Sequence, residues 1–71
     1  MKFISGLPVY NSADVVEETS KGKGSWRQYR WLCPECGEIA HTLSIAYDGE
    51  TEWLKARCTD EDCGHEFAVI E

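Results

Sequence analysis

Two short cysteine-containing segments decide the fold of this chain: Cys33-Pro34-Glu35-Cys36-Gly37 and Cys58-Thr59-Asp60-Glu61-Asp62-Cys63-Gly64. Their spacing is C-x2-C-x21-C-x4-C. Two close pairs of thiols, separated by a segment the length of one β-hairpin, are the pattern of a tetrahedral four-cysteine metal site. The chain has 71 residues, and domains of this size commonly need disulfides or a metal to supplement a small core.

The remaining sequence favours a metal over disulfides. The N-terminal segment is a poor secretory signal, because Ser5, Gly6 and Pro8 interrupt its apolar residues. No stretch approaches the roughly 20 apolar residues of a membrane span. We therefore expect a cytoplasmic protein with no membrane partner, in a compartment where thiols stay reduced.

The four thiols predict one structural zinc ion. Zinc takes four thiolates in a tetrahedron, Pro34 favours the tight turn within the first pair, and Gly37 gives backbone N–H groups access to the sulfur. The predicted ligands are Cys33, Cys36, Cys58 and Cys63. A rubredoxin-like iron site, which would make the chain an electron carrier, is the rival, but the C-x4-C pair departs from that pattern.

The rest of the sequence supplies no catalytic machinery. A closed four-cysteine site has no open coordination position. No nucleophile lies at a suitable spacing from a base, and Lys21-Gly22-Lys23-Gly24 lacks the spacing of a phosphate-binding loop. We expect neither histidine to be a ligand, with His41 packed on an apolar strand face and His65 exposed. The sequence therefore predicts a protein that is not an enzyme.

The pattern between and around the cysteines predicts a small all-β fold. Residues 1–13 read as an extended lead-in, and residues 14–32 as an N-terminal β-hairpin, with a short helix capped by Asn11 or Ser12 as the alternative for its start. Residues 39–47 alternate with a larger apolar face, and Asp48-Gly49 favours a hairpin turn into 51–57. We predict a single domain, 1–71, in which residues 33–71 form a four-cysteine zinc ribbon with an antiparallel sheet.

Charge and aromatic residues point to candidate partner surfaces. The net charge is −6, so general attraction to a nucleic-acid backbone is disfavoured. Arginines and aromatics still interleave in two stretches, as they do where partners dock. The alternative is that the aromatics pack over the ribbon and the cations are only solvated. The candidate partner-binding residues are Trp26, Arg27, Tyr29, Arg30, Trp53, Lys55 and Arg57.

The cysteine region resembles a known family. Cys33-Pro34-x-Cys36 with Ala40-His41 and Ser44 after it, and a C-x4-C pair with Phe67 four residues on, are similar to the Ogr/Delta family of small zinc-binding activators of late genes in temperate tailed phages. The resemblance covers residues 31–71 and implies one zinc ion on the four cysteines. It also implies a transcription activator that contacts promoter DNA and the α subunit of host RNA polymerase. The chain departs from the family in its acidic charge and in the 32 residues before its first cysteine.

These observations predict a small structural-zinc regulatory protein, phage-related and located in the host cytoplasm, that acts on transcription through RNA polymerase or promoter DNA. The alternative is a protein-interaction module, or an inhibitor of a host enzyme, that makes no contact with nucleic acid. The iron electron carrier is the third hypothesis.

Overall fold

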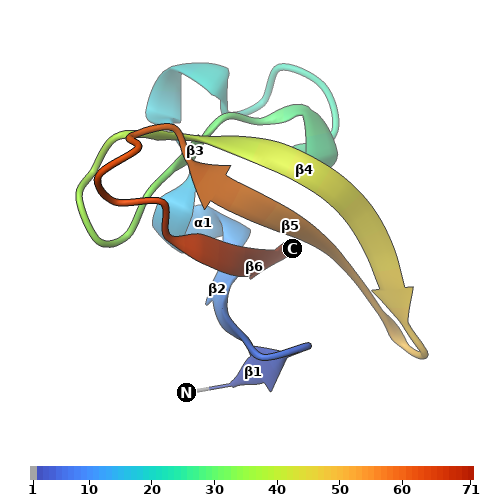
Figure 1. Ribbon diagram of the computed structural model, residues 1–71. Coiled ribbons are helices and arrows are strands. Elements are labelled where there is room, and N and C mark those ends of the chain that lie inside the picture. Colours follow the sequence, from blue (N-terminus) through green and yellow to red (C-terminus); the bar gives the residue numbers. More distant parts are fainter. Residues whose placement is uncertain (1) are drawn as a thin grey trace.

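A computed structural model describes residues 2–71 of the chain (Figure 1). It contains one curled sheet of six strands in the order β1-β2-β6-β5-β4-β3. The strands are β1 (Phe3–Ile4), β2 (Leu7–Asn11), β3 (Trp31–Leu32), β4 (Ile39–Asp48), β5 (Thr51–Cys58) and β6 (Glu66–Ile70). Three helical turns complete the fold: α1 (Ser12–Val15) and the 3₁₀ turns η1 (Glu18–Ser20) and η2 (Trp26–Gln28).

The second half of the chain folds as predicted, into antiparallel strands. β4 and β5 form the expected hairpin, closed by the Asp48↔Thr51 pair. Gly49 in its turn has φ of 67°, a left-handed conformation that glycine adopts without a steric penalty. β6 pairs antiparallel with β5, and β3 with the start of β4. The prediction of a small, mostly β domain is confirmed.

The expected wholly antiparallel sheet is wrong at one strand. β2 pairs with β6 in parallel, through Val9↔Ala68, Tyr10↔Val69 and Asn11↔Ile70. Parallel neighbours need a crossover connection, and here the rest of the chain supplies it. The sequence predicted an extended lead-in over residues 1–13. In the structure β1 and β2 form a small antiparallel hairpin there, with its turn at Ser5 and Gly6.

The predicted N-terminal hairpin over residues 14–32 does not form. This segment holds α1, η1 and η2, and one isolated antiparallel bridge, Val16↔Trp31, is all that remains of the expected pairing. Local hydrogen bonds compete with a ladder here. The Ser20 hydroxyl donates to the Glu17 carbonyl (2.7 Å) and accepts from the Arg30 N–H (3.0 Å). A short helix does follow Asn11, as in the alternative prediction, but the Asn11 side chain makes no capping hydrogen bond.

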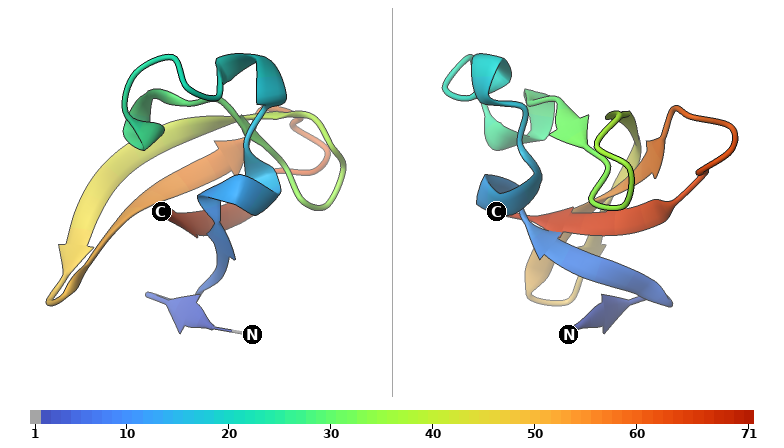
Figure 2. Two further views of the ribbon diagram at one scale, coloured as in Figure 1. Left: turned by 180° about the vertical axis from the view of Figure 1, so that it is seen from behind. Right: turned by 90° about the vertical axis from the view of Figure 1, so that its left-hand side faces the viewer.

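The segment from α1 to η2, residues 12–28, is called the helical segment below. It covers one face of the sheet, and the core lies between the two (Figure 2). Val15 and Val16 pack with Trp31 against strand residues of β4, β5 and β6. The largest fully buried side chains are Trp31, Phe67, Leu54 and Val69. Tyr10, Trp26 and Tyr29 pack at the periphery of this cluster.

A bulge in β4 breaks the apolar face that the alternation predicted. Thr42 pairs with Ala56, but Ser44, two residues on, pairs with Lys55. The additional residue, Leu43, shifts the alternation, and a shift of one residue moves every later side chain to the other face. The shift places Ile45 and Tyr47 on the face of Leu54 and Glu52. Leu43, Ile45 and Tyr47 nevertheless lie outside the core cluster and are 52%, 52% and 67% exposed.

Candidate metal centre

The four cysteines meet at one end of the sheet, opposite the β4–β5 turn. Cys33 follows β3 and Cys36 lies in the loop that leads to β4. Cys58 ends β5, and Cys63 lies in the loop before β6. Because β3 and β5 both flank β4, the two loops lie side by side (Figures 1 and 2). Sheet topology therefore brings together Cys36 and Cys58, which are 22 positions apart in sequence.

The sulfur positions fit one shared metal ion. All four Sγ atoms lie within 4.8 Å of one another. The Cys33–Cys63 separation is 3.6 Å and the Cys36–Cys58 separation is 3.3 Å. A tetrahedron with metal–sulfur bonds of about 2.3 Å has edges of about 3.8 Å, whereas a disulfide brings two sulfurs to about 2.05 Å. The four cysteines are free thiols, in an arrangement that can hold a metal.

Each pair sits on a tight, hydrogen-bonded turn. In the first, the Gly37 N–H donates to the Cys33 carbonyl (2.9 Å) and the Cys33 N–H donates to the Glu38 carbonyl (2.7 Å). In the second, the Cys63 and Gly64 N–H groups both donate to the Asp60 carbonyl, at 3.1 and 2.8 Å. These bonds close the two turns that carry the cysteines.

The two turns are also joined to each other. The Thr59 N–H and hydroxyl both donate to the Ile39 carbonyl, at 3.0 and 2.7 Å. The Cys58 N–H donates to the His65 carbonyl (2.9 Å) and closes the second loop. The relative position of the two pairs is thus set by backbone hydrogen bonding.

The thiols differ in how easily they lose a proton. Burial, followed by the neighbouring sulfurs, raises the pKa of Cys58 to about 12, although the Asp60 N–H acts to lower it. Burial also acts to raise the pKa of Cys33, but the N–H groups of Cys36 and Glu35 donate to its sulfur and the net shift is downward. Four thiolates this close repel one another, and a divalent cation among them would relieve that repulsion.

The two histidines exchange the environments that the sequence predicted. His41 is exposed, because it precedes the bulge and lies on the face of Arg57 rather than of the core. His65 is partly buried and stacks on Phe67, with ring centroids 5.8 Å apart and an interplanar angle of 18°. Neither ring belongs to the four-sulfur cluster.

The predicted partner-binding residues of the 26–31 stretch make contacts within the chain. Trp26 and Tyr29 pack beside Trp31, with centroid separations of 6.3 and 6.2 Å. Arg27 pairs with Glu52 and stands 5.9 Å over the Trp26 ring. Arg30 pairs with Glu17 at 3.3 Å.

The second predicted stretch alternates on the face of β5 away from the helical segment. Trp53 is buried, at 8% exposure. Lys55 pairs with Glu66 at 3.0 Å, and Arg57 is exposed. Of the seven predicted residues, Arg57 is the one that is exposed and forms no ion pair within residues 2–71.

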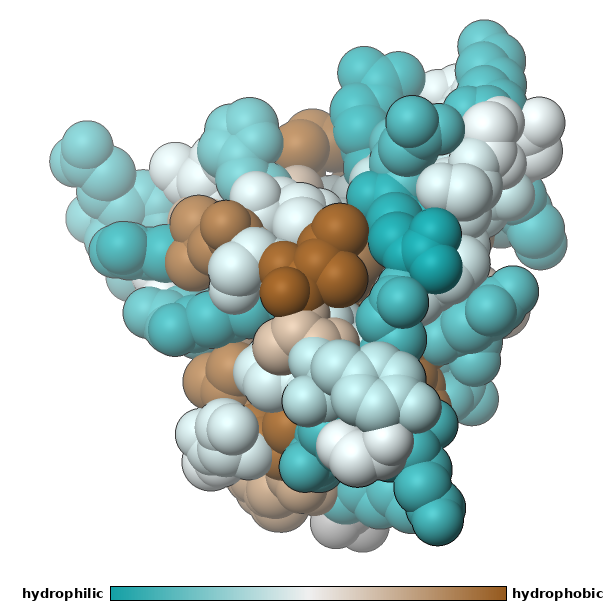
Figure 3. Space-filling view, turned by 90° about the vertical axis from the view of Figure 1, so that its right-hand side faces the viewer, coloured by the Kyte–Doolittle hydropathy of each residue, from teal (hydrophilic) through white to brown (hydrophobic). Residues whose placement is uncertain are grey.

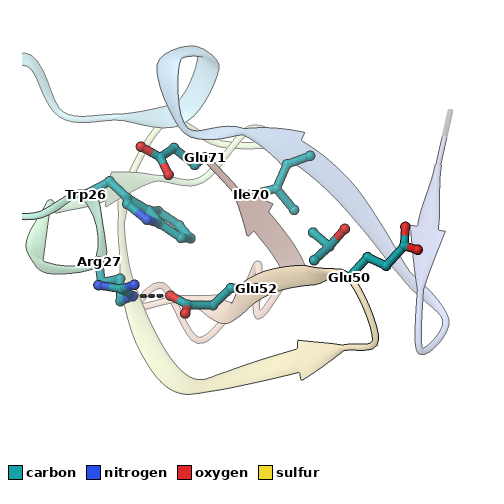
Figure 4. A pocket seen from close by; sticks show the side chains of 7 residues that line it. Trp26, Arg27, Glu50, Glu52, Ile70 and Glu71 are labelled. Carbon is teal, nitrogen blue, oxygen red and sulfur yellow. Dashed lines mark hydrogen bonds and ion pairs between the residues drawn. The ribbon is translucent and has the colours of Figure 1, made fainter.

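The structure contains a pocket beside Trp26 and Arg27 that the sequence did not predict. It lies between η2, the start of β5 and the end of β6 (Figure 4), with a volume of about 390 Å³. Its lining residues are Trp26, Arg27, Glu50, Thr51, Glu52, Ile70 and Glu71. The hydrogen bond from Arg27 lowers the pKa of Glu52. This ion pair balances the charge of one of the three glutamate side chains that line the pocket. The acidic residues near the hairpin turn were visible in sequence, but their meeting with Trp26 depends on the fold.

Comparison with known proteins adds no identity. No family model, curated protein or solved structure matches the chain. Within residues 2–71, no helix is long and apolar enough to cross a membrane.

Proposed function

We propose that this chain is a small structural-zinc protein that acts by binding another protein. One observation carries the metal part of the proposal: four thiols lie within 4.8 Å of one another on two hydrogen-bonded turns. Four sulfur ligands saturate a tetrahedral ion and leave no position for a substrate or water. Such an ion supports structure rather than hydrolysis.

Zinc is preferred to iron because of the second cysteine loop. The rubredoxin-like pattern has two C-x2-C turns, whereas Cys58 and Cys63 are separated by four residues. The test is the metal content and visible spectrum of protein produced in medium that supplies both metals. We expect one zinc per chain and a colourless protein. A red protein with one iron per chain would replace this proposal with an electron carrier.

A binding role, rather than catalysis, is supported by the exposed surface. Apolar side chains of β4 remain exposed and carboxylates line the pocket beside them. The partner we propose is RNA polymerase, on the basis of the resemblance of residues 31–71 to the Ogr/Delta activators. An acidic protein is poorly suited to bind the phosphate backbone, so the proposed action on transcription runs through the polymerase, and direct promoter contact is secondary.

Affinity purification from the native host, followed by mass spectrometry, tests this role. Recovery of RNA polymerase subunits with the wild-type chain, but not with a metal-site variant, supports the transcription proposal. Recovery of a different enzyme, with its activity reduced by the purified chain, would identify an inhibitor instead. A gel shift of promoter DNA that weakens with added salt would establish DNA contact.

A further inference from the structure

The outer edge of β4 lacks a neighbouring strand along most of its length. β3 pairs with β4 only at Trp31↔Ala40 and Leu32↔Ile39. From His41 to Asp48, no strand among residues 2–71 lies on the side of β4 opposite β5. Figure 1 shows this length running from β3 out to the hairpin turn. Alternate backbone N–H and C=O groups on such an edge point outward and can pair with an added strand.

This edge carries little of the usual protection against strand addition. Proteins protect open edges with lysine, proline or bulges, and β4 contains neither lysine nor proline. Its bulge lies at Leu43, near the covered end. Beyond the bulge, Ser44 to Asp48 pair regularly with Lys55 to Thr51. The regular, open stretch Ser44–Asp48 is the part that can receive a strand.

Exposed apolar side chains accompany the open backbone. Ile45 and Tyr47 are 52% and 67% exposed on the face they share with Leu54 and Glu52. Figure 3 shows apolar side chains on this side of the molecule with hydrophilic ones around them. In strand addition, backbone hydrogen bonds supply affinity and alternate side chains supply selectivity. Ile45 and Tyr47 are placed to contact alternate residues of an added strand.

The charge around the edge selects the kind of strand. Between Arg30 and Lys55 the sequence has no lysine or arginine but five acids: Glu35, Glu38, Asp48, Glu50 and Glu52. Asp48 and Glu50, at the open end, make no ion pair within residues 2–71. Glu50 also lines the pocket with Glu71. A second copy of this chain would bring the same acids and no base on its own β4, so its charge opposes self-pairing.

We propose that the open edge of β4, Ser44–Asp48, binds an extended basic segment of a partner protein as an added strand. This inference deepens the proposed function and rests on its protein-binding part. Basic side chains of the segment would meet Asp48 and Glu50, while its apolar side chains would contact Ile45 and Tyr47.

The test uses the metal-loaded full chain and two synthetic peptides, one alternating lysine with valine and one alternating glutamate with valine. Binding is followed by amide chemical shifts, and hydrogen exchange measures protection of the β4 amides. We expect the lysine peptide to shift and protect amides within 44–48 and to bind more tightly than the glutamate peptide. Ile45→Lys should weaken binding by about tenfold or more. The matched control is Phe3→Lys, which also replaces an exposed apolar residue (62% exposed) on a distant strand and should change affinity less than twofold, roughly.

Several outcomes would overturn the inference. Equal binding of both peptides would remove the charge argument. Lysine-peptide shifts confined to residues outside β4, or equal losses in the two variants, would place the contact elsewhere. Sedimentation showing a dimer that Ile45→Lys dissociates would assign the edge to a second copy. An intact metal-bound spectrum without peptide binding would reject the edge site and leave the metal proposal standing.

Discussion

At the scale of single residues, the four cysteines occupy unlike positions. Cys33 and Cys58 are buried, at 2% and 4% exposure, whereas Cys36 is exposed. Cys63 is partly buried, so Cys36 is the most accessible of the four. Cys36 contributes little to packing, so its substitution isolates the contribution of a ligand from that of a core side chain.

Cys36→Ser should abolish stoichiometric metal binding and the cooperative fold together. Metal binding in small domains of this kind is coupled to folding, and the whole stability of a domain is only about 5–15 kcal/mol. Circular dichroism melting and metal analysis measure the two effects. Glu35→Gln, in the same turn, is the control and should keep both. A Cys36→Ser protein that melts cooperatively without metal would count against the coupling.

Metal affinity should rise with pH across the neutral range. With its pKa raised to about 12, the Cys58 thiol is protonated at neutral pH in the absence of metal, so binding a cation must displace that proton. Each proton released changes the apparent dissociation constant by about tenfold per pH unit. Chelator competition at several pH values measures the slope. An affinity independent of pH would mean that the thiols are already ionised.

At the scale of elements, the β4 bulge explains why one strand prediction failed in detail. The alternation from Ile39 to Tyr47 correctly indicated a strand, but period alone does not reveal an additional residue. Only cross-strand register shows that Thr42 faces the core while Ser44 faces away. Leu54 and Ala56, on the regular partner strand β5, are completely buried.

The same substitution at two leucines tests this assignment of faces. Leu54 is completely buried and Leu43 is 52% exposed. Leu54→Ala should lower the free energy of unfolding by about 2–5 kcal/mol, because it removes buried contacts and leaves a cavity. Leu43→Ala should change it by about 0.5 kcal/mol or less. Urea titrations of both variants measure the difference, and comparable losses would show that Leu43 is packed.

The sequence predicted the cysteine cluster and the β4–β5 hairpin well because both are encoded locally. The cysteine spacing and Asp48-Gly49 act over a few residues. It predicted residues 14–32 poorly because β-branched Val15 and Val16 suit a strand. In the structure Val15 ends α1, Val16 forms a single bridge with Trp31, and both side chains are buried in the core. Parallel pairing of β2 with β6 joins residues about as far apart as the chain allows, and no local pattern reports it.

At the scale of the whole molecule, two separate sets of contacts hold the fold together. The core cluster joins the helical segment to one face of the sheet, while the four thiols join its two loops at one end. A core in a domain of this size supplies only about 3–5 kcal/mol. The metal should therefore decide whether the chain is folded, and the open edge of β4 can act only when it is.

A zinc titration of the reduced, metal-free chain, followed by its amide NMR spectrum, tests this dependence most directly. We predict a poorly dispersed spectrum without metal, conversion to one dispersed set of signals, and completion at one zinc per chain. A dispersed, native-like spectrum before zinc is added, or a fold that forms without the metal and does not change with it, would contradict the account.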